Sequence, residues 1–183
     1  YFSNGTDLKG LADSRIPGIE VTTGSLGHGF SVGVGLALGA KMRETDQKTF
    51  VLVGDGEINE GAIWEGALYS AHHDLDNFMV IVDENGFQAM GKTREIIALG
   101  SIQSKFESFG FDAITADGHD EISINKAIKD LWKINNNKPK ALIAKTVKGK
   151  GVNFMENDNS WHYTRLNQDS YRKAILSLNE NIK

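Results

Sequence analysis

Short apolar runs alternate with helical periodicities along this chain. Four runs have the length of strands, and they lie at residues 49–53, 78–82, 111–114 and 141–144. The strongest runs are apolar on both faces, which is typical of strands buried in a parallel sheet. The pattern therefore predicts a sheet built from four buried strands.

Helical patterns fill the gaps between these runs. Residues 31–42 are rich in small side chains, and apolar residues recur at helical spacing within residues 63–75 and 124–132. Strands that alternate with helices predict right-handed βαβ crossovers. We therefore expect an α/β fold, in which a parallel sheet carries helices on both faces.

Length and composition limit the domain organisation. The chain has 183 residues, of which 40% are apolar and 24% are charged, and both fractions are near globular averages. The last residues have the pattern of a charged amphipathic helix over residues 167–182. We expect one domain over residues 1–166, lacking some upstream residues because the chain does not begin with Met, and a C-terminal helix over residues 167–183.

Charge and cysteine content exclude several classes of function. The net charge is −4 with an isoelectric point of about 5.7, which argues against a general nucleic-acid-binding protein. The sequence has no cysteine, which excludes disulfides, thiolate zinc sites and a cysteine nucleophile. No secretory signal is visible at the start, and we expect a cytoplasmic protein.

One uncharged stretch approaches the length of a membrane span. Residues 22–40 carry no formal charge over 19 positions, but they include six glycines. This composition favours a glycine-rich loop that leads into a buried helix, so we expect no membrane association.

Candidate chemistry lies where the predicted strands end. Asp55 follows the first strand and stands between Gly54 and Gly56. An acidic side chain at the end of a strand is well placed to hold a hard cation, and the glycines allow the backbone to approach a phosphate. The alternative is a tight turn between strand and helix in which Asp55 only caps the helix.

Asn85 follows the second strand and strengthens the first interpretation. The interval between Gly56 and Asn85 holds one helix and one strand, so the two strand ends are expected to be neighbours. A carboxylate, an amide oxygen and a carbonyl, which we assign to Phe87, suit Mg²⁺ when two diphosphate oxygens complete its octahedron. Asn85 is otherwise a common turn former beside Gly86. Together the two elements indicate thiamine diphosphate rather than a dinucleotide, for which a G-x-G-x-x-G motif is missing.

Three long segments resemble transketolases. They are PGIEVTTGSLGHG at residues 17–29, GDGEINEGAIWEGALYSAHHDLDNFMVIVDENGFQ at residues 54–88, and KTVKGKGVNFMENDNSWH at residues 145–162. Their order and spacing match the diphosphate-binding domain of this family, over about residues 16–162. The strongest likeness is to the N-terminal subunit of split transketolases, whose two halves are separate polypeptides.

The resemblance implies a role for each matching residue. Asp55, Asn85 and the Phe87 carbonyl would bind Mg²⁺, or Ca²⁺ or Mn²⁺ in its place. The remaining matches would bind thiamine diphosphate or serve catalysis: Gly56 at the diphosphate, Gly24 and Leu26 near the aminopyrimidine and the ring region, His162 near the diphosphate, and Glu60 in a network that links cofactor sites across the subunit interface.

Other polar residues have simpler explanations. His28 is as well explained as a polar filler of the glycine-rich loop, and adjacent His72 and His73 face different sides of a helix, which favours structural or interfacial roles. The lysines at positions 145, 148 and 150 are better explained as a solvated basic turn than as a phosphate site.

The resemblance also implies a partner. The Glu that activates the cofactor comes from the pyrimidine-binding domain, so we expect a separate pyrimidine-binding C-terminal subunit, with a homodimer as the minimum and a heterotetramer as the active form. Residues 9–13 lack the Gly-His-Pro motif that contacts the sugar in transketolases, which leaves the sugar substrate open.

These features lead to one principal hypothesis and two alternatives. The principal one is the transfer of a two-carbon ketol unit between sugars. The alternatives are one component of a 2-oxo-acid decarboxylase or dehydrogenase, and a non-catalytic cofactor-binding module.

Overall fold

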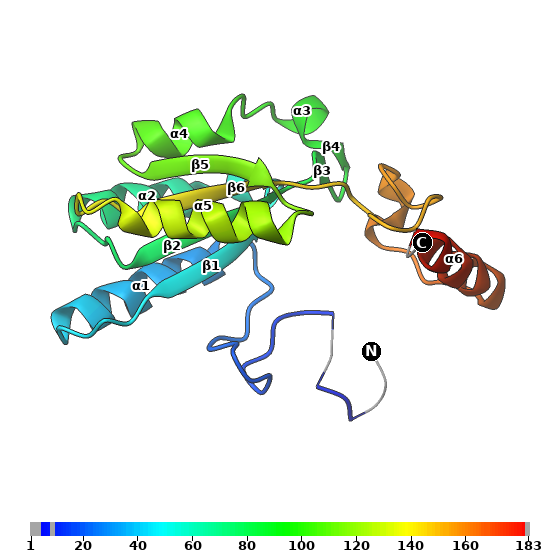
Figure 1. The fold of residues 1–183 in the computed structure, drawn as a ribbon, viewed down its shortest axis with the longest axis horizontal. Helices are drawn as coiled ribbons and strands as arrows, with labels where there is room; N and C mark the ends of the chain where they lie inside the picture. Colours follow the sequence, from blue (N-terminus) through cyan, green and yellow to red (C-terminus); the bar gives the residue numbers. More distant parts are fainter. Residues whose placement is uncertain (1–4, 8–9, 182–183) are drawn as a thin grey trace.

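The computed structural model describes residues 5–7 and 10–181, and predictions that involve residues 1–4, 8–9 and 182–183 lie outside them. Its centre is a four-stranded sheet with the order β1-β2-β6-β5 (Figure 1). All three strand pairs are parallel, so the predicted parallel α/β sheet is confirmed. The strands are β1 (Thr49–Gly54), β2 (Phe78–Glu84), β5 (Asp112–Asp117) and β6 (Lys140–Lys145).

The expected burial on both faces holds for the two central strands and is wrong for β1. In β2 and β6 most side chains are buried, because helices pack on both faces of these central strands. In contrast, among the described residues β1 pairs only with β2, and its Phe50 and Leu52 are 50% and 72% exposed. The apolar run at residues 49–53 therefore forms an edge strand.

Helices cover both faces of the sheet, as the sequence predicts. One face packs against α1 (His28–Met42), α2 (Gly61–His72) and α4 (Ile102–Ser108) in a core that includes Phe30, Ile63 and Phe106. The other face packs against α5 (Glu121–Lys133), where Leu131 meets Met79 and Leu142 of the sheet.

The uncharged stretch at residues 22–40 is a loop followed by most of α1, which begins earlier than the predicted residue 31. A Cβ atom added at Gly33 of α1 would lie 2.2 Å from Cγ2 of Val51. This small residue therefore lets the helix approach β1 closely. Within the described residues, no helix is both long enough and apolar enough to cross a membrane.

Several short elements have no counterpart in the predicted pattern. They are β3 (Phe87–Gln88) and β4 (Gly91–Lys92), which form an antiparallel hairpin, the helix α3 (Thr93–Ile96), and the 3-10 turns η1 (Glu57–Asn59) and η2 (Asn159–His162). The hairpin lies beyond the carboxyl ends of β2 and β6 (Figure 1). The irregular segments that carry chemistry are thus gathered at one end of the sheet.

The last helix, α6 (Gln168–Asn181), lies apart from the sheet (Figure 1). It does not cover the main core. The pattern predicted an amphipathic helix here, and of its apolar residues Ala174 is buried, whereas Ile175 and Leu178 are about 40% exposed.

Candidate functional site

Asp55 lies directly after β1 and is almost fully buried, with 2% of its surface exposed. Its Oδ2 accepts a hydrogen bond of 2.6 Å from the backbone N–H of Gly86. Its Oδ1 is buried and has no hydrogen-bond partner among the described residues. Burial raises the pKa of Asp55 to about 6, aided by the charges of Asp83 and Glu84 and opposed by backbone N–H groups. A buried carboxylate with an unused oxygen is a group that a cation would stabilise.

Asn85 is held in one orientation beside this carboxylate. Its Oδ1 accepts a hydrogen bond from the N–H of Phe87 at 2.9 Å, and its Nδ2 donates to Oδ1 of Asp83 at 3.3 Å. The N–H of Asp55 donates to the carbonyl of Asp83 at 3.1 Å, which joins the two strand ends. The sequence predicted this proximity correctly, whereas the binding roles of Asp55, Asn85 and Phe87 stay predictions.

The donor set fits a hard cation that shares its coordination with a ligand. Among the described residues Oδ1 of Asp55 has no hydrogen-bond partner, and Oδ1 of Asn85 accepts one hydrogen bond, so an amide oxygen retains a second lone pair. No group of three or more His, Cys, Asp or Glu residues is arranged to hold a metal in the part of the chain that the structure describes. A site with only a few oxygen ligands from the protein suits Mg²⁺, because this ion commonly completes its octahedral coordination with phosphate oxygens and water.

Gly56 allows the hairpin to pack against the end of β1. A Cβ atom at this position would lie 2.6 Å from Cβ of Gln88 in β3. Oε1 of Gln88 in turn accepts a hydrogen bond of 2.9 Å from Nδ2 of Asn59 in η1. The backbone around Gly56 is therefore enclosed on one side by the hairpin, as expected where a backbone must come close to a neighbour.

The glycine-rich loop lies against η1 and the start of α2. The N–H of Gly27 donates to Oε1 of Glu57 at 2.9 Å, and a Cβ atom at Gly27 would lie 3.0 Å from Cβ of Glu60. This contact places Glu60 beside the loop that carries Gly24 and Leu26. The two loop residues line a cleft of about 760 Å³ that also reaches Glu57 and the open edge of β1.

His162, in η2, contacts a lysine that the sequence analysis assigned to a solvated turn. Nζ of Lys148 lies 3.3 Å from Nδ1 of His162. A lysine ammonium can only donate, so Nδ1 accepts and the ring is neutral with its proton on Nε2. Partial burial and the nearby charge of Lys148 both lower the pKa of His162. The ring is thus prepared to donate from Nε2.

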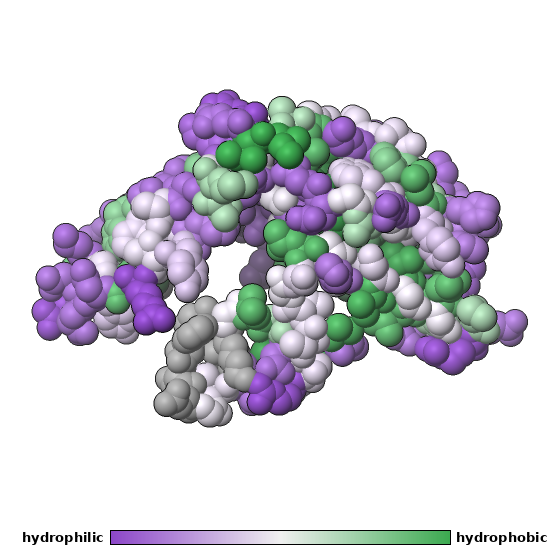
Figure 2. All heavy atoms as spheres, turned by 180° about the vertical axis from the view of Figure 1, so that it is seen from behind, coloured by the Kyte–Doolittle hydropathy of each residue, from purple (hydrophilic) through white to green (hydrophobic). Residues whose placement is uncertain are grey.

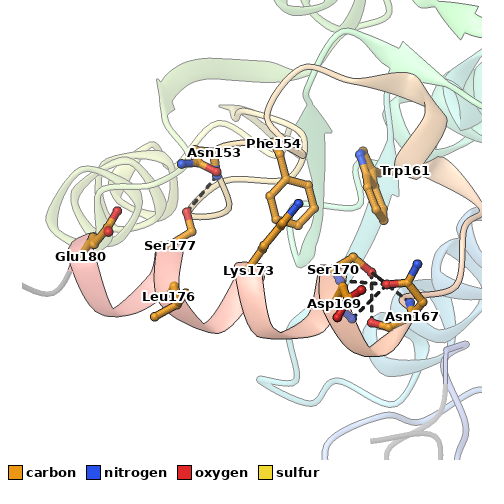
Figure 3. A pocket seen from close by; sticks show the side chains of 10 residues that line it. All are labelled: Asn153, Phe154, Trp161, Asn167, Asp169, Ser170, Lys173, Leu176, Ser177 and Glu180. Atoms are coloured by element: carbon orange, nitrogen blue, oxygen red, sulfur yellow. Dashed lines mark hydrogen bonds between the residues drawn. The ribbon is translucent and has the colours of Figure 1, made fainter.

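The segment that carries His162 is supported from two sides. Nδ2 of Asn159 donates to the carbonyl of Ala89 in the hairpin at 3.2 Å, which attaches η2 to the hairpin that follows β2. On the other side, the Ser177 hydroxyl of α6 accepts a hydrogen bond from the N–H of Asn153 at 3.0 Å (Figure 3). Phe154 and Trp161 stack edge to face beside a pocket of about 580 Å³ under α6. The C-terminal helix therefore supports this segment rather than the sheet.

The remaining polar candidates have local partners. His28 is exposed and its Nδ1 lies 3.2 Å from the carbonyl of Leu26, which fits a loop filler. His72 and His73 contact each other on α2, and His73 also stacks on Tyr69. Lys145 and Lys150 form ion pairs of 2.5 Å with Glu84 and 4.0 Å with Glu156, as surface lysines commonly do.

Sequence reasoning gave no role in the site to three residues that contact it, of which only Lys148 had been considered. Glu57 binds the glycine-rich loop, Thr146 donates a hydrogen bond to Oδ1 of Asp83, and Lys148 contacts His162. Thr146 and Lys148 follow β6, and the position of polar residues after a strand was the signal that had identified Asp55 and Asn85. Applied to β6, the same rule would have directed attention to both.

Comparison with known proteins identifies the chain's relatives. A family model described as transketolase, thiamine diphosphate binding domain, matches residues 9–179. An apulose-4-phosphate transketolase subunit from Phocaeicola vulgatus is 41% identical over 179 residues, covering 98% of this chain and 63% of the relative. The 6-deoxy-6-sulfo-D-fructose transketolase subunit SqwG of a Clostridium species is 36% identical, covering 95% of this chain and 63% of the relative. The chain thus spans about three fifths of the length of these relatives.

Solved structures agree with the sequence relatives. The transketolase of Campylobacter jejuni has a TM-score of 0.81 and 32% identity, over 88% of this chain and 26% of that one. The Pichia stipitis transketolase in complex with sedoheptulose 7-phosphate has a TM-score of 0.79 and 27% identity, over 90% of this chain and 26% of that one. The fold, the family match and the identities lead to the same conclusion, namely that the chain belongs to the transketolase family and comprises its thiamine diphosphate binding domain.

Proposed function

We propose that this chain is the diphosphate-binding part of a split transketolase, which transfers a two-carbon ketol unit between sugars. The observation that carries the proposal is the buried carboxylate of Asp55, with its unpaired Oδ1 beside the fixed amide of Asn85. A site of this kind suits a divalent cation that also binds a diphosphate. The names of the relatives support the reaction class, since two of them are subunits of transketolases.

Within this proposal each residue has a defined task. Asp55, Asn85 and the Phe87 carbonyl hold Mg²⁺, for which Ca²⁺ or Mn²⁺ can substitute, and the Gly56 amide contacts the diphosphate. Bound thiamine diphosphate supplies the carbon nucleophile of the reaction. Gly24 and Leu26 lie along its ring side, and Nε2–H of His162 donates to an anionic oxygen near the diphosphate.

The substrate proposed is a ketose with an anionic end group. One relative is named for apulose 4-phosphate, another for a 6-sulfo sugar, and the Pichia stipitis structure holds sedoheptulose 7-phosphate. Phosphate and sulfonate share a negative charge and several acceptor oxygens, which lysine and histidine donors can recognise. Screening phosphorylated, sulfonated and uncharged ketoses as donors would test this choice, and a preference for uncharged ketoses or 2-oxo acids would contradict it.

Exposed apolar residues support an assembly with other subunits. Val32, Leu36 and Met42 of α1 and Leu68 and Tyr69 of α2 are each at least 38% exposed. Figure 2 shows apolar side chains at the surface on this side of the molecule. Contiguous exposed apolar side chains commonly mark protein interfaces. We propose a homodimer at minimum and a heterotetramer with two pyrimidine-binding subunits.

Reconstitution tests the function directly. The polypeptide that carries this chain should bind thiamine diphosphate with Mg²⁺ by calorimetry but show no ketol transfer alone. Adding the protein encoded next to it should produce turnover, which Glu60→Gln should lower by weakening the link between cofactor sites. Full activity without a partner would refute the split arrangement, and the absence of cofactor binding would refute the function itself.

A further inference from the structure

The turn after β5 is hydrogen-bonded to the segment that follows β6. The N–H of Gly118 donates to the carbonyl of Lys145 at 2.7 Å, and the N–H of Val147 donates to Nε2 of His119 at 2.7 Å. A Cβ atom at Gly118 would lie 2.5 Å from Cγ2 of Thr146, so the turn packs directly on the β6 exit. Hydrogen bonds with two adjacent residues of the turn, Gly118 and His119, thus hold the short segment over residues 145–147.

The hydrogen bond from Val147 selects one tautomer of the His119 ring. Because Nε2 accepts a hydrogen bond from an amide N–H, this geometry selects the tautomer whose N–H is on Nδ1. The backbone N–H of His119 donates to Oδ1 of Asp117 at 2.9 Å, and Oδ1 of Asp120 caps α5 through the N–H of Ile122 at 3.0 Å. The turn is therefore anchored on both sides of the histidine.

The segment that His119 holds carries two side chains directed to the candidate site. The N–H of Thr146 donates to the carbonyl of Glu84 at 3.2 Å, and its hydroxyl donates to Oδ1 of Asp83, which also receives Nδ2 of Asn85 at 3.3 Å. These bonds form a continuous path from the β5 turn to Asn85.

A second contact connects the segment after β6 to His162, at the other end of the candidate site. Lys148 follows Val147 directly, and its Nζ lies 3.3 Å from Nδ1 of His162. The position of the Val147 backbone therefore determines where the side chain of Lys148 begins. One backbone anchor, at Val147, thus lies between Thr146 and Lys148, the two residues whose contacts lead to Asn85 and His162.

From this geometry we propose that His119 is a positioning residue for cofactor binding, acting through Thr146 and Lys148. This inference rests on the proposed function. Without the Nε2 acceptor, the N–H of Val147 loses its partner, and the segment over residues 145–150 gains freedom. Asn85 and His162 then lose their fixed orientations, although neither touches His119 in the described contacts. A fixed surrounding shell of this kind is what metal and phosphate sites require to keep their ligands oriented.

Three variants of the full-length polypeptide test the proposal. His119→Ala removes the acceptor, while His119→Gln retains an acceptor oxygen at similar reach. Thr115→Ala is the matched control, because Thr115 lies on β5, just before the turn, but donates to Gln103 at 2.6 Å, away from the segment. Each protein is measured by amide hydrogen exchange, by ¹⁵N NMR of the histidine rings, and by calorimetry with Mg²⁺ and thiamine diphosphate.

In the Ala variant, amide exchange over residues 145–150 should rise about tenfold and the His162 ring signals should shift toward a mixture of tautomers. Cofactor affinity should fall about five- to tenfold, and the Gln variant should recover most of each effect. The control should match the unchanged protein. Faster exchange with unchanged His162 signals and unchanged affinity would overturn the proposal, as would a Gln variant that behaves like Ala.

The failure of the proposed function would look different. In that case the unchanged protein would bind no thiamine diphosphate, while the exchange and ring signals would still respond to His119→Ala. If the Ala variant does not fold, the ring signals of the unchanged protein decide, because a proton on Nε2 of His119 contradicts the proposal.

Discussion

Oδ2 of Asp55 lies 2.6 Å from the backbone nitrogen of Gly86, so one carboxylate oxygen joins the end of β1 to the turn after β2. This bond uses one oxygen and orients the other, Oδ1, which has no partner among the described residues. The arrangement separates two tasks within a single side chain. One oxygen fixes the local structure, and the other is the one that the proposed function assigns to a cation.

The first prediction concerns metal binding. Asp55→Ala should weaken the binding of Mg²⁺ together with thiamine diphosphate by at least about a hundredfold, because the diphosphate loses its charged bridge to the protein. Calorimetry measures the affinity. Asp46→Ala, at an exposed position in the loop before β1, is the control and should change nothing. Equal affinities in the two variants would refute the metal assignment.

The second prediction concerns pH. The pKa of Asp55 is raised to about 6 in the folded protein, so between pH 4 and pH 6 the folded state holds a proton that the unfolded state has lost. The stability from this group is present below pH 4 and is lost as the pH rises through 6. Without divalent metal, Asp55→Asn should therefore gain about 2 to 3 kcal/mol of unfolding free energy relative to the unchanged protein between pH 4 and pH 7. Urea denaturation in a chelating buffer measures this difference, and a constant difference across that range would contradict it.

These two predictions rest on a part of the site that the sequence could specify. The strands and the polar residues at their ends follow from local pattern, and parallel strands place their carboxyl ends together. The exposure of Phe50 and Leu52 could not be predicted, because strand order depends on pairing between distant segments. The hairpin and α3 are too short to show periodicity, and the bond from Val147 to His119 joins residues 28 positions apart. The contact of Lys148 with His162 could not be predicted for the same reason, because these two residues are also separated in sequence.

Histidine titration provides the third prediction. The pKa of His162 should lie below its ordinary value, because partial burial and the charge of Lys148 both disfavour the protonated ring. Lys148→Met should raise this pKa, since it removes the positive charge next to the ring. NMR titration of the histidine signals measures both values. Lys150→Met, which removes a lysine paired with Glu156, should leave the pKa unchanged, and equal shifts in both variants would argue against the contact.

Two glycines of α1 should respond in opposite directions. Gly33→Ala should destabilise the fold by about 1 to 3 kcal/mol, because the new Cβ would lie 2.2 Å from Cγ2 of Val51. Gly35→Ala has open space around its Cβ position and should stabilise the helix by about 0.5 to 1 kcal/mol. Thermal and urea denaturation measure both changes. A Gly33→Ala variant as stable as Gly35→Ala would mean that α1 does not pack on β1 as described.

A buried ion pair gives the fifth prediction. Lys140 is 1% exposed, and its Nζ lies 2.7 Å from Oδ2 of Asp112 and 2.9 Å from the carbonyl of Ile134. Lys140→Met should cost about 3 kcal/mol of stability, because it leaves the Asp112 carboxylate without its charge partner. Lys126→Met breaks an exposed pair with Asp130 and should cost less than about 1 kcal/mol. Similar costs for the two variants would show that the Lys140 pair is not buried in solution.

The strand order has a consequence for how the chain folds during synthesis. Within the described sheet β5 pairs only with β6, although β6 is made after it, and β2 pairs with β6 across about 60 residues, as in the Val80–Ala141 register. The β1–β2 unit can therefore form early on the ribosome. In contrast, β5 has no strand to pair with until β6 has been synthesised. During that interval the apolar edge of β2 is open to wrong pairing, which makes the arrival of β6 the event that completes the sheet.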